Sequence, residues 1–108
     1  MDKQEIYDRV KAHLLKQNEI CLGPDGFATW LRYNGLASPL GHLMICYDRN
    51  FEDFPLDCLP EVAWFGVCEP TREMVGFVDE LEHLHFMGAP EHWPKKLAQL
   101  AERHGLIP

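Results

Sequence analysis

The 108-residue sequence lacks the local patterns that identify the common classes of enzyme. We find no phosphate-binding P-loop, no Rossmann glycine pattern, no Gly-x-Ser-x-Gly and no His-Glu-x-x-His. Only four cysteines are present, at positions 21, 46, 58 and 68, and no two are spaced as Cys-x-x-Cys. The sequence therefore predicts no redox dithiol and offers no zinc-ligand pair of the usual spacing. An enzyme is the function class that we expect least.

Long apolar runs are also missing. The longest uncharged run, Tyr33 to Tyr47, has fifteen residues and is broken by glycine and proline, which makes it too short to cross a bilayer. The first residues, MDKQEIYDRVK, are charged from the second position on, unlike a signal peptide. We therefore expect a protein in the cytoplasm of a host cell, with reduced thiols and no contact with a membrane.

Positive charge is scarce and unevenly placed. The formal net charge is −7, and the stretch from residue 48 to residue 91 holds eleven acids against two arginines. An acidic surface repels phosphate backbones, so we expect no direct binding to nucleic acid. The same surface attracts a protein partner with a basic surface. The alternative is an acidic surface that only keeps the protein in solution.

The residues that are present favour helices. Asp2 has the properties of a helix cap, with Glu5 as its capping-box partner. Apolar residues at every fourth position from Ile6 then predict a helix over about residues 3 to 17. Asn34-Gly35 predicts a small hairpin, and Ser38-Pro39 predicts the start of a short, buried helix over about residues 40 to 46.

Two further helices are predicted in the second half of the chain. Pro70-Thr71 begins a helix with one apolar stripe that ends before Gly88, and Trp93-Pro94 precedes a last helix closed by Gly105. We expect an irregular loop over 48–60 and a short strand or buried extended segment over 61–68. The whole chain, 1–108, is predicted to be one mainly α domain, a bundle of three long helices and one short helix with a small β-hairpin.

Several short motifs match a known family. They are His13 to Gln17 (HLLKQ), Gly35-Leu36, Gly41 to Met44, Leu81 to His85 (LEHLH), Trp93, and His104-Gly105-Leu106. In these motifs the chain resembles a family of small, uncharacterised proteins encoded by phages, prophages and bacteria. The resemblance implies a phage or prophage origin and brings no known activity. Trp30 and Ser38 stand where the family has cysteines, so the resemblance implies no chemistry for that pair here.

Histidine and cysteine are the residues that suggest a metal site. His42 and Cys46 lie four apart on the predicted short helix and would point the same way. A closed zinc site needs four nitrogen or sulfur ligands, and His83 and His85 point about 200° apart on a helix. We expect no metal and no cofactor. The alternative is a small-ligand or zinc site made by His42, Cys46 and His85.

The predicted third helix carries other ionisable residues. His85 falls on its apolar stripe, so we expect a core histidine bonded to a loop carbonyl, with a ligand contact at the floor of a pocket as the alternative. Its four carboxylates are expected on an evenly solvated outer face: Glu73, Asp79, Glu80 and Glu82. Acid–base catalysis needs one desolvated carboxyl group, so we expect none from this set.

Aromatic and arginine side chains gather just before the predicted hairpin turn. Trp30, Arg32 and Tyr33 belong to the residue types that dominate protein interfaces, with Trp30 and Arg32 on one face of the hairpin and Tyr33 on the other. Four acids are expected to steer a basic partner: Asp48, Glu52, Asp53 and Asp57. The alternative places Trp30 and Tyr33 in the core.

The function that these observations favour is a small, non-enzymatic accessory protein that acts as an inhibitor or adaptor by binding a host or defence-system protein. A homodimer formed through apolar helix edges such as Leu15 and Leu97 stays an open alternative.

Overall fold

The computed structural model describes all 108 residues and contains four α-helices and one two-stranded sheet. The helices are α1 (Lys3–Gln17), α2 (Pro39–Leu43), α3 (Arg72–Phe86) and α4 (Trp93–Arg103), and the strands are β1 (Arg32–Tyr33) and β2 (Leu36–Ala37). Four 3-10 helices complete the chain: η1 (Arg49–Asp53), η2 (Leu56–Cys58), η3 (Glu61–Trp64) and η4 (Pro90–His92). The predicted fold class, mainly α with three long helices, one short helix and a small hairpin, is confirmed.

Capping side chains begin three of the four α-helices. Asp2 accepts a hydrogen bond from the backbone N–H of Glu5 at 2.9 Å, as the capping box predicts. Ser38 caps α2 and Thr71 caps α3 in the same way. Each cap satisfies a backbone donor that the first helical turn leaves without an intrahelical partner. The predicted starts of these helices are therefore confirmed.

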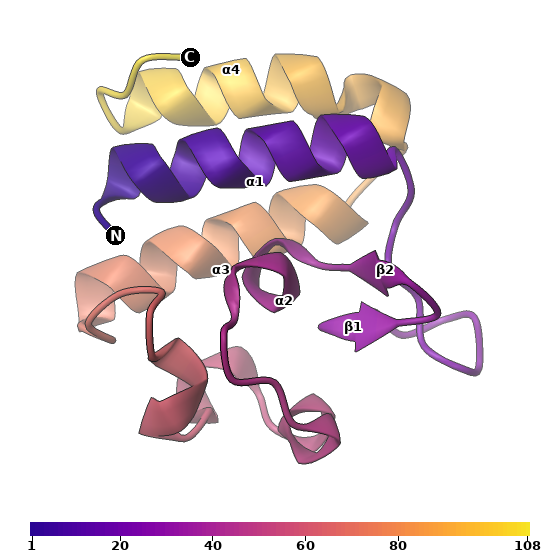
Figure 1. The fold of residues 1–108 in the computed structure, drawn as a ribbon. Coiled ribbons are helices and arrows are strands. Elements are labelled where there is room, and N and C mark those ends of the chain that lie inside the picture. Colours follow the sequence, from indigo (N-terminus) through magenta and orange to yellow (C-terminus); the bar gives the residue numbers. More distant parts are fainter.

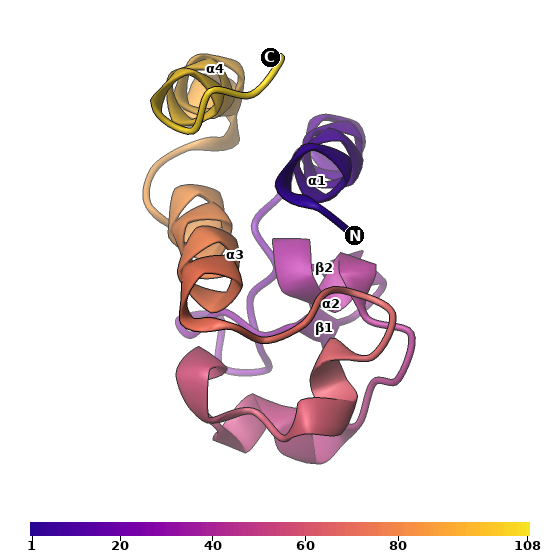
Figure 2. The ribbon, with the colours of Figure 1, turned by 90° about the vertical axis from the view of Figure 1, so that its left-hand side faces the viewer.

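The three long helices pack side by side around one apolar core (Figures 1 and 2). The core side chains are Ile6, Tyr7, Val10 and Leu14 of α1, Phe77, Val78 and Leu81 of α3, and Trp93, Leu97 and Leu100 of α4. The Tyr7 hydroxyl donates a hydrogen bond to the Leu97 carbonyl at 3.1 Å and joins α1 to α4. The helix α2, the sheet and η1 to η3 lie below this layer in Figure 1. None of the helices has the length and hydrophobicity needed to cross a membrane.

The hairpin forms where it was predicted. Asn34 and Gly35 both have positive φ, 54° and 81°, which is the backbone of the tight turn that Asn-Gly favours. The strands pair antiparallel, with Arg32 opposite Ala37 and Tyr33 opposite Leu36. Gln17, the last residue of α1, accepts from the Ala37 N–H at 2.9 Å and thereby fixes the hairpin to the helical layer.

The short helix α2 lies against the segment that enters the hairpin. A Cβ on Gly41 would come within 1.9 Å of the Leu31 carbonyl oxygen, so the two backbones approach as closely as only glycine allows. The prediction placed the end of α2 near Cys46, but α2 ends at Leu43. Met44, at the C-cap, leaves the helical region with ψ of 130°, and the following residues are bends.

Residues 48–68 differ from the prediction. The predicted irregular loop contains η1 and η2, and the predicted strand over 61–68 contains η3 instead. No neighbouring strand is available to pair with this segment, so its backbone groups bond locally, as in the Ala63 N–H to Pro60 carbonyl bond of 2.9 Å. Trp64 is buried there as expected, whereas Phe65 is 65% exposed.

Candidate functional site

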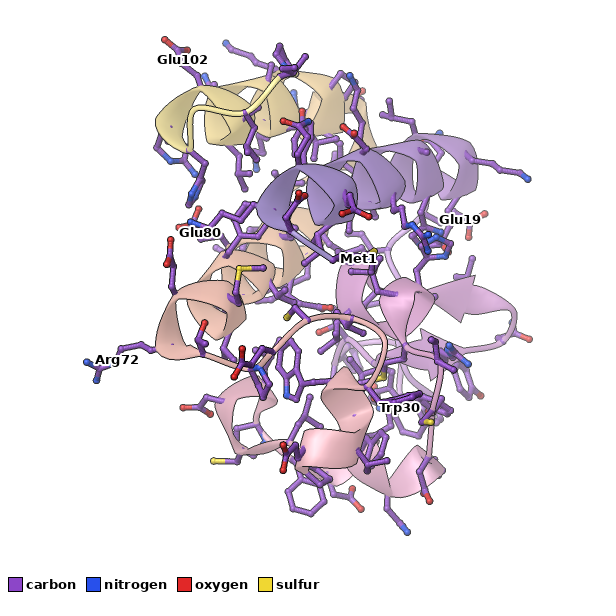
Figure 3. The ribbon with its side chains drawn as sticks, turned by 60° about the vertical axis from the view of Figure 1, so that its left-hand side comes forward. Met1, Glu19, Trp30, Arg72, Glu80 and Glu102 are labelled. Atoms are coloured by element: carbon purple, nitrogen blue, oxygen red, sulfur yellow. The ribbon has the colours of Figure 1, made fainter.

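The predicted interface residues of the hairpin lie on one surface with η1. The Trp30 ring has the Arg49 guanidinium 4.2 Å from its centroid and meets the Tyr33 ring edge-on at 5.4 Å. The prediction that Trp30 and Tyr33 lie on opposite faces of the hairpin is wrong. Trp30 lies before the start of β1, so its side chain does not take part in the alternation of side chains along that strand. Both rings keep part of their surface in solvent, so neither belongs to the sealed core. Figure 3 shows Trp30 in the half of the molecule remote from α4.

Arg32 supports this surface through hydrogen bonds to two backbone carbonyls. Its Nε donates to the Gly41 carbonyl at 2.8 Å and its Nη2 donates to the Met44 carbonyl at 2.6 Å. These carbonyls lie at the end of α2, where the last turn lacks intrahelical donors. The guanidinium also lies 5.0 Å from the centre of the Tyr47 ring. Arg32 is therefore a half-buried cap of α2, a role that the sequence did not reveal.

Glu52 also has a structural role. Its Oε1 accepts from the Leu31 N–H at 2.7 Å, and its Oε2 accepts from the Arg32 N–H at 3.2 Å and from the Tyr47 hydroxyl. Burial and the Glu52 carboxylate together raise the pKa of Tyr47 well above its usual range. Glu52 thus fastens η1 to the hairpin. The other predicted steering acids, Asp48, Asp53 and Asp57, are exposed.

An exposed apolar patch is formed by the residue two positions after the end of α2 and by residues in and just after η3. Ile45, Val62 and Phe65 are 66%, 53% and 65% exposed, and we call them the apolar patch. Ile45 covers Gly66, since a Cβ on that glycine would come within 2.1 Å of the Ile45 Cδ1. Glu61 and Glu69 line the same hollow as Val62 and Phe65, which has a volume of about 520 Å³. The patch therefore has an acidic rim.

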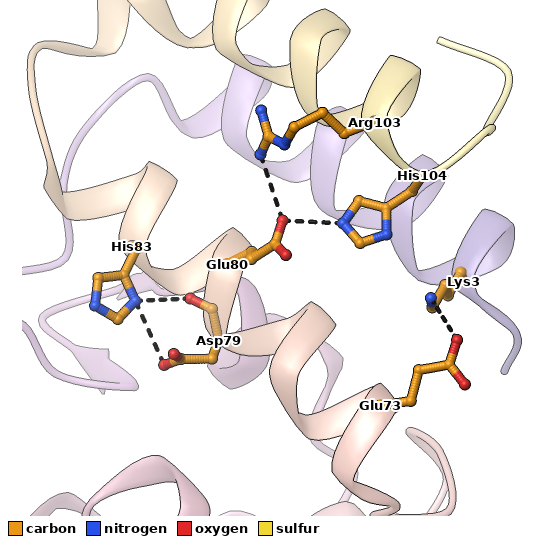
Figure 4. Close-up of polar contacts among 7 residues, drawn as sticks. All are labelled: Lys3, Glu73, Asp79, Glu80, His83, Arg103 and His104. Carbon is orange, nitrogen blue, oxygen red and sulfur yellow. Dashed lines mark hydrogen bonds and ion pairs between the residues drawn. The ribbon is translucent and has the colours of Figure 1, made fainter.

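Three of the four α3 carboxylates lie where they were expected. Glu73 is exposed and Asp79 and Glu80 are partly exposed, and Figure 4 shows all three next to cationic or imidazole partners. The Lys3 Nζ donates to Glu73 at 2.8 Å, and the His104 Nε2 lies 2.9 Å from Glu80. The Lys3 hydrogen bond holds the pKa of Glu73 below its usual range. These three carboxylates reach solvent, and each lies beside a lysine or histidine side chain.

Glu82 does not lie on that face, and the prediction is wrong for this residue. It is only 9% exposed, and its Oε1 accepts from the Ser38 hydroxyl at 2.8 Å and the Leu40 N–H at 2.6 Å. Burial raises the pKa of Glu82 to about 7. A signal was available, because Glu82 lies four residues after Val78 and three before His85, both on the buried stripe.

Family models, curated proteins and solved structures were compared with this chain, and none of them matches. A proposal for its function therefore depends on the contacts and the exposed surfaces of this chain.

The histidines and cysteine proposed as ligands do not converge. His85 is fully buried, whereas His42 is exposed and its ring lies parallel to His13 with centroids 4.1 Å apart. Cys46 lies beyond the end of α2. No group of three or more His, Cys, Asp or Glu side chains is placed to hold a metal ion. The alternative site of His42, Cys46 and His85 is therefore not formed.

His85 is a core histidine, as predicted, but with a different partner. Its Nε2 accepts from the backbone N–H of Cys21 at 3.0 Å, so the ring is bonded to a loop donor and not to a loop carbonyl. Burial, with a smaller contribution from His13, lowers the pKa of His85 to about 4. A neutral imidazole at this position joins α3 to the segment that follows α1.

Proposed function

We propose that the protein is a small, non-enzymatic accessory protein that binds a host or defence-system protein with a basic surface. The observation that supports this most directly is the apolar patch of Ile45, Val62 and Phe65. Clustered exposed apolar side chains with a polar rim are characteristic of protein interaction sites. The resemblance to phage- and prophage-encoded proteins supports the choice of partner class.

The charges around the patch favour a basic partner. Glu61 and Glu69 line the hollow beside it, and residues 48 to 91 hold eleven acids against two arginines. Opposite charges on a partner would speed association and fix its orientation more than they would raise affinity. Trp30 and Tyr33 extend the contact surface over the hairpin, together with Asp48, Asp53 and Asp57. Arg32 and Glu52 contribute by holding that surface in shape.

The experiment compares wild-type protein with an Ile45→Ser/Phe65→Ser double variant as bait in a lysate of the source organism, with quantitative mass spectrometry. The matched control is Ile107→Ser, which removes an apolar side chain that is 76% exposed and lies outside the patch. We expect the specific partner to be depleted about ten-fold or more by the double variant and retained by the control.

Stopped-flow kinetics and calorimetry with the purified partner complete the test, because the first measures the association rate and the second measures the affinity. The association rate should fall as salt is raised and should also fall for Asp57→Lys, because the steering charges are exposed. Identical partners and affinities for the wild type and the folded double variant would contradict the proposal.

A further inference from the structure

A hollow with basic walls lies where the second half of α1 faces α2 and the hairpin (Figure 1). Its volume is about 730 Å³. Arg9, His13 and Lys16 of α1 and His42 of α2 line it, and no acidic residue does. The whole chain has 17 acids against 10 lysines and arginines, so the charge of this hollow is opposite to that of the molecule as a whole.

Three of these side chains gather because of helix geometry. Arg9, His13 and Lys16 follow one another at intervals of four and three residues, which places them on one face of α1. Like charges at these intervals repel one another. All six ion pairs of the protein use other basic residues, so no carboxylate of the chain lies within ion-pair distance of Arg9 or Lys16.

The two histidines supply an independent observation. The rings of His13 and His42 lie parallel, with centroids 4.1 Å apart. The Nε2 of His13 donates to the Ala37 carbonyl at 2.8 Å, whereas the ring of His42 has no hydrogen-bond partner in the protein. Burial, followed by the charges of His13, Arg32 and Arg9, lowers the pKa of His42. The groups that act on His42 are thus all basic, and none is a counterion.

The walls of the hollow are fixed by hydrogen bonds that leave the basic side chains free. The Gln17 Oε1 accepts from the Ala37 N–H at 2.9 Å, and its Nε2 donates to the Ala37 carbonyl at 3.0 Å. Together with the bond from His13, these contacts hold β2 against α1. A ligand therefore meets walls that are already in place, which reduces the entropy cost of binding.

We propose that this hollow binds the phosphoryl group of a phosphate monoester, held by Arg9 and Lys16 of α1 and by a hydrogen bond from His42 of α2. The phosphoryl group carries a charge of about −1.5 to −2 at pH 7 and three strong acceptor oxygens, so it accepts from donors on several sides. An arginine fork matches two of these oxygens, and a lysine adds a point charge. A carboxylate fits less well, because it has one charge and two oxygens.

The test is a titration of the ¹⁵N-labelled full chain with methyl phosphate at pH 7, followed by amide chemical shifts. The amides of Gly35 and Leu36 are the reporters, because both residues line the hollow. We expect saturable shifts with a dissociation constant on the order of 1 mM. Acetate should bind at least about five-fold more weakly, and sodium chloride at equal ionic strength should produce no saturable shift.

Titration of the His42 ring gives a second readout. The charged and titratable groups that face it are His13 and Arg9 of α1 and Arg32 of β1. An anion in the hollow should raise the pKa of His42, because it favours the protonated ring. Sulfate has the same tetrahedral shape and stays a dianion from pH 8 to pH 5, so it isolates the protein's titration. Its binding should tighten several-fold over this range as imidazole rings gain charge.

Variants distinguish the site from a general charge effect. Arg9→Gln and Lys16→Gln should each weaken methyl phosphate binding about five-fold or more, and His42→Gln should weaken it a few-fold. Arg72→Gln is the matched control, because it removes an equal charge from the start of α3 and does not line the hollow. Arg9, Lys16 and Arg72 are all exposed, so these variants should fold. Equal effects of Arg9→Gln and Arg72→Gln would overturn the proposal.

Two further ligands identify the source of the phosphoryl group. Binding of N-acetyl-phosphoserine methylamide that is tighter than that of methyl phosphate would support the proposal and indicate a phosphorylated protein. Tighter binding of adenosine monophosphate would support it and indicate a nucleotide. Shifts that grow linearly without saturation for all three phosphates would overturn the proposal. The residues of the apolar patch do not line the hollow, so the outcome is independent of the proposed function.

Discussion

Glu82→Gln is predicted to stabilise the protein at neutral and alkaline pH. The glutamine keeps an oxygen that accepts from Ser38 and Leu40, the two donors that bond to Glu82 Oε1. What it removes is the cost of ionising a buried carboxyl group. At pH 5, where folded Glu82 is protonated, wild type and variant should differ little.

The magnitude follows from the linkage between protonation and folding. In the folded protein the pKa of Glu82 is raised from 4.5 to about 7. Its contribution to stability is therefore fully present below the unfolded pKa and is lost as the pH rises through about 7. With 1.36 kcal/mol for each pH unit, the loss is on the order of 3 kcal/mol. The variant lacks this loss, so its advantage should grow by about 2 to 3 kcal/mol from pH 5 to pH 8.

Urea unfolding at pH 5, 6, 7 and 8, followed by tryptophan fluorescence, measures this difference. Glu73→Gln is the control, because the pKa of that exposed carboxyl is lowered by Lys3. The change in the free energy of unfolding that Glu73→Gln causes should not become more favourable above pH 5. A Glu82→Gln difference that stays constant across the four pH values would refute the reasoning, because it would mean that folded Glu82 ionises as it does in the unfolded chain.

Three other substitutions test the contacts that support the site, each by urea unfolding. His85→Leu should destabilise the protein at pH 7 by about 1 to 3 kcal/mol, since it leaves a buried backbone N–H without its acceptor; no loss would contradict the assigned hydrogen bond. Arg32→Lys should cost about 1 to 2 kcal/mol, because an ammonium cannot replace a fork that reaches two carbonyls. Gly41→Ala should destabilise strongly, because its Cβ would meet the Leu31 carbonyl at 1.9 Å. Its matched control, Gly76→Ala, adds a Cβ in open space within α3 and should stabilise by roughly 1 kcal/mol; equal effects of the two glycine changes would contradict the described packing.

The sequence was sufficient to predict the features that depend on neighbouring residues. The start of α1 follows from Asp2 and its capping bond, and the hairpin follows from the positive φ that Asn34 and Gly35 accept readily. The residues of 61–68 are apolar enough for a strand, but a strand needs a partner. No local pattern shows that a partner is absent, so η3 was missed.

The site depends on contacts between distant parts of the chain, and these were predicted least well. Glu82 receives its donors from residues more than forty positions earlier, and Arg32 caps a helix that begins after the turn. Residue type suggested an interface contact for Arg32 and a solvated outer face for Glu82. Periodicity carried the better signal for Glu82, since it shares the buried stripe of Val78 and His85.

The five residues of α2 have an importance beyond their length. Arg32 bonds to carbonyls at the end of α2, Glu82 bonds to its first turn, and Leu31 touches its backbone at Gly41. The segment that enters the hairpin and the middle of α3 therefore share α2 as a common contact and should open together as one cooperative unit. A change that loosens α2, such as Gly41→Ala, would therefore speed hydrogen exchange at amides of the hairpin as well as at those of α2.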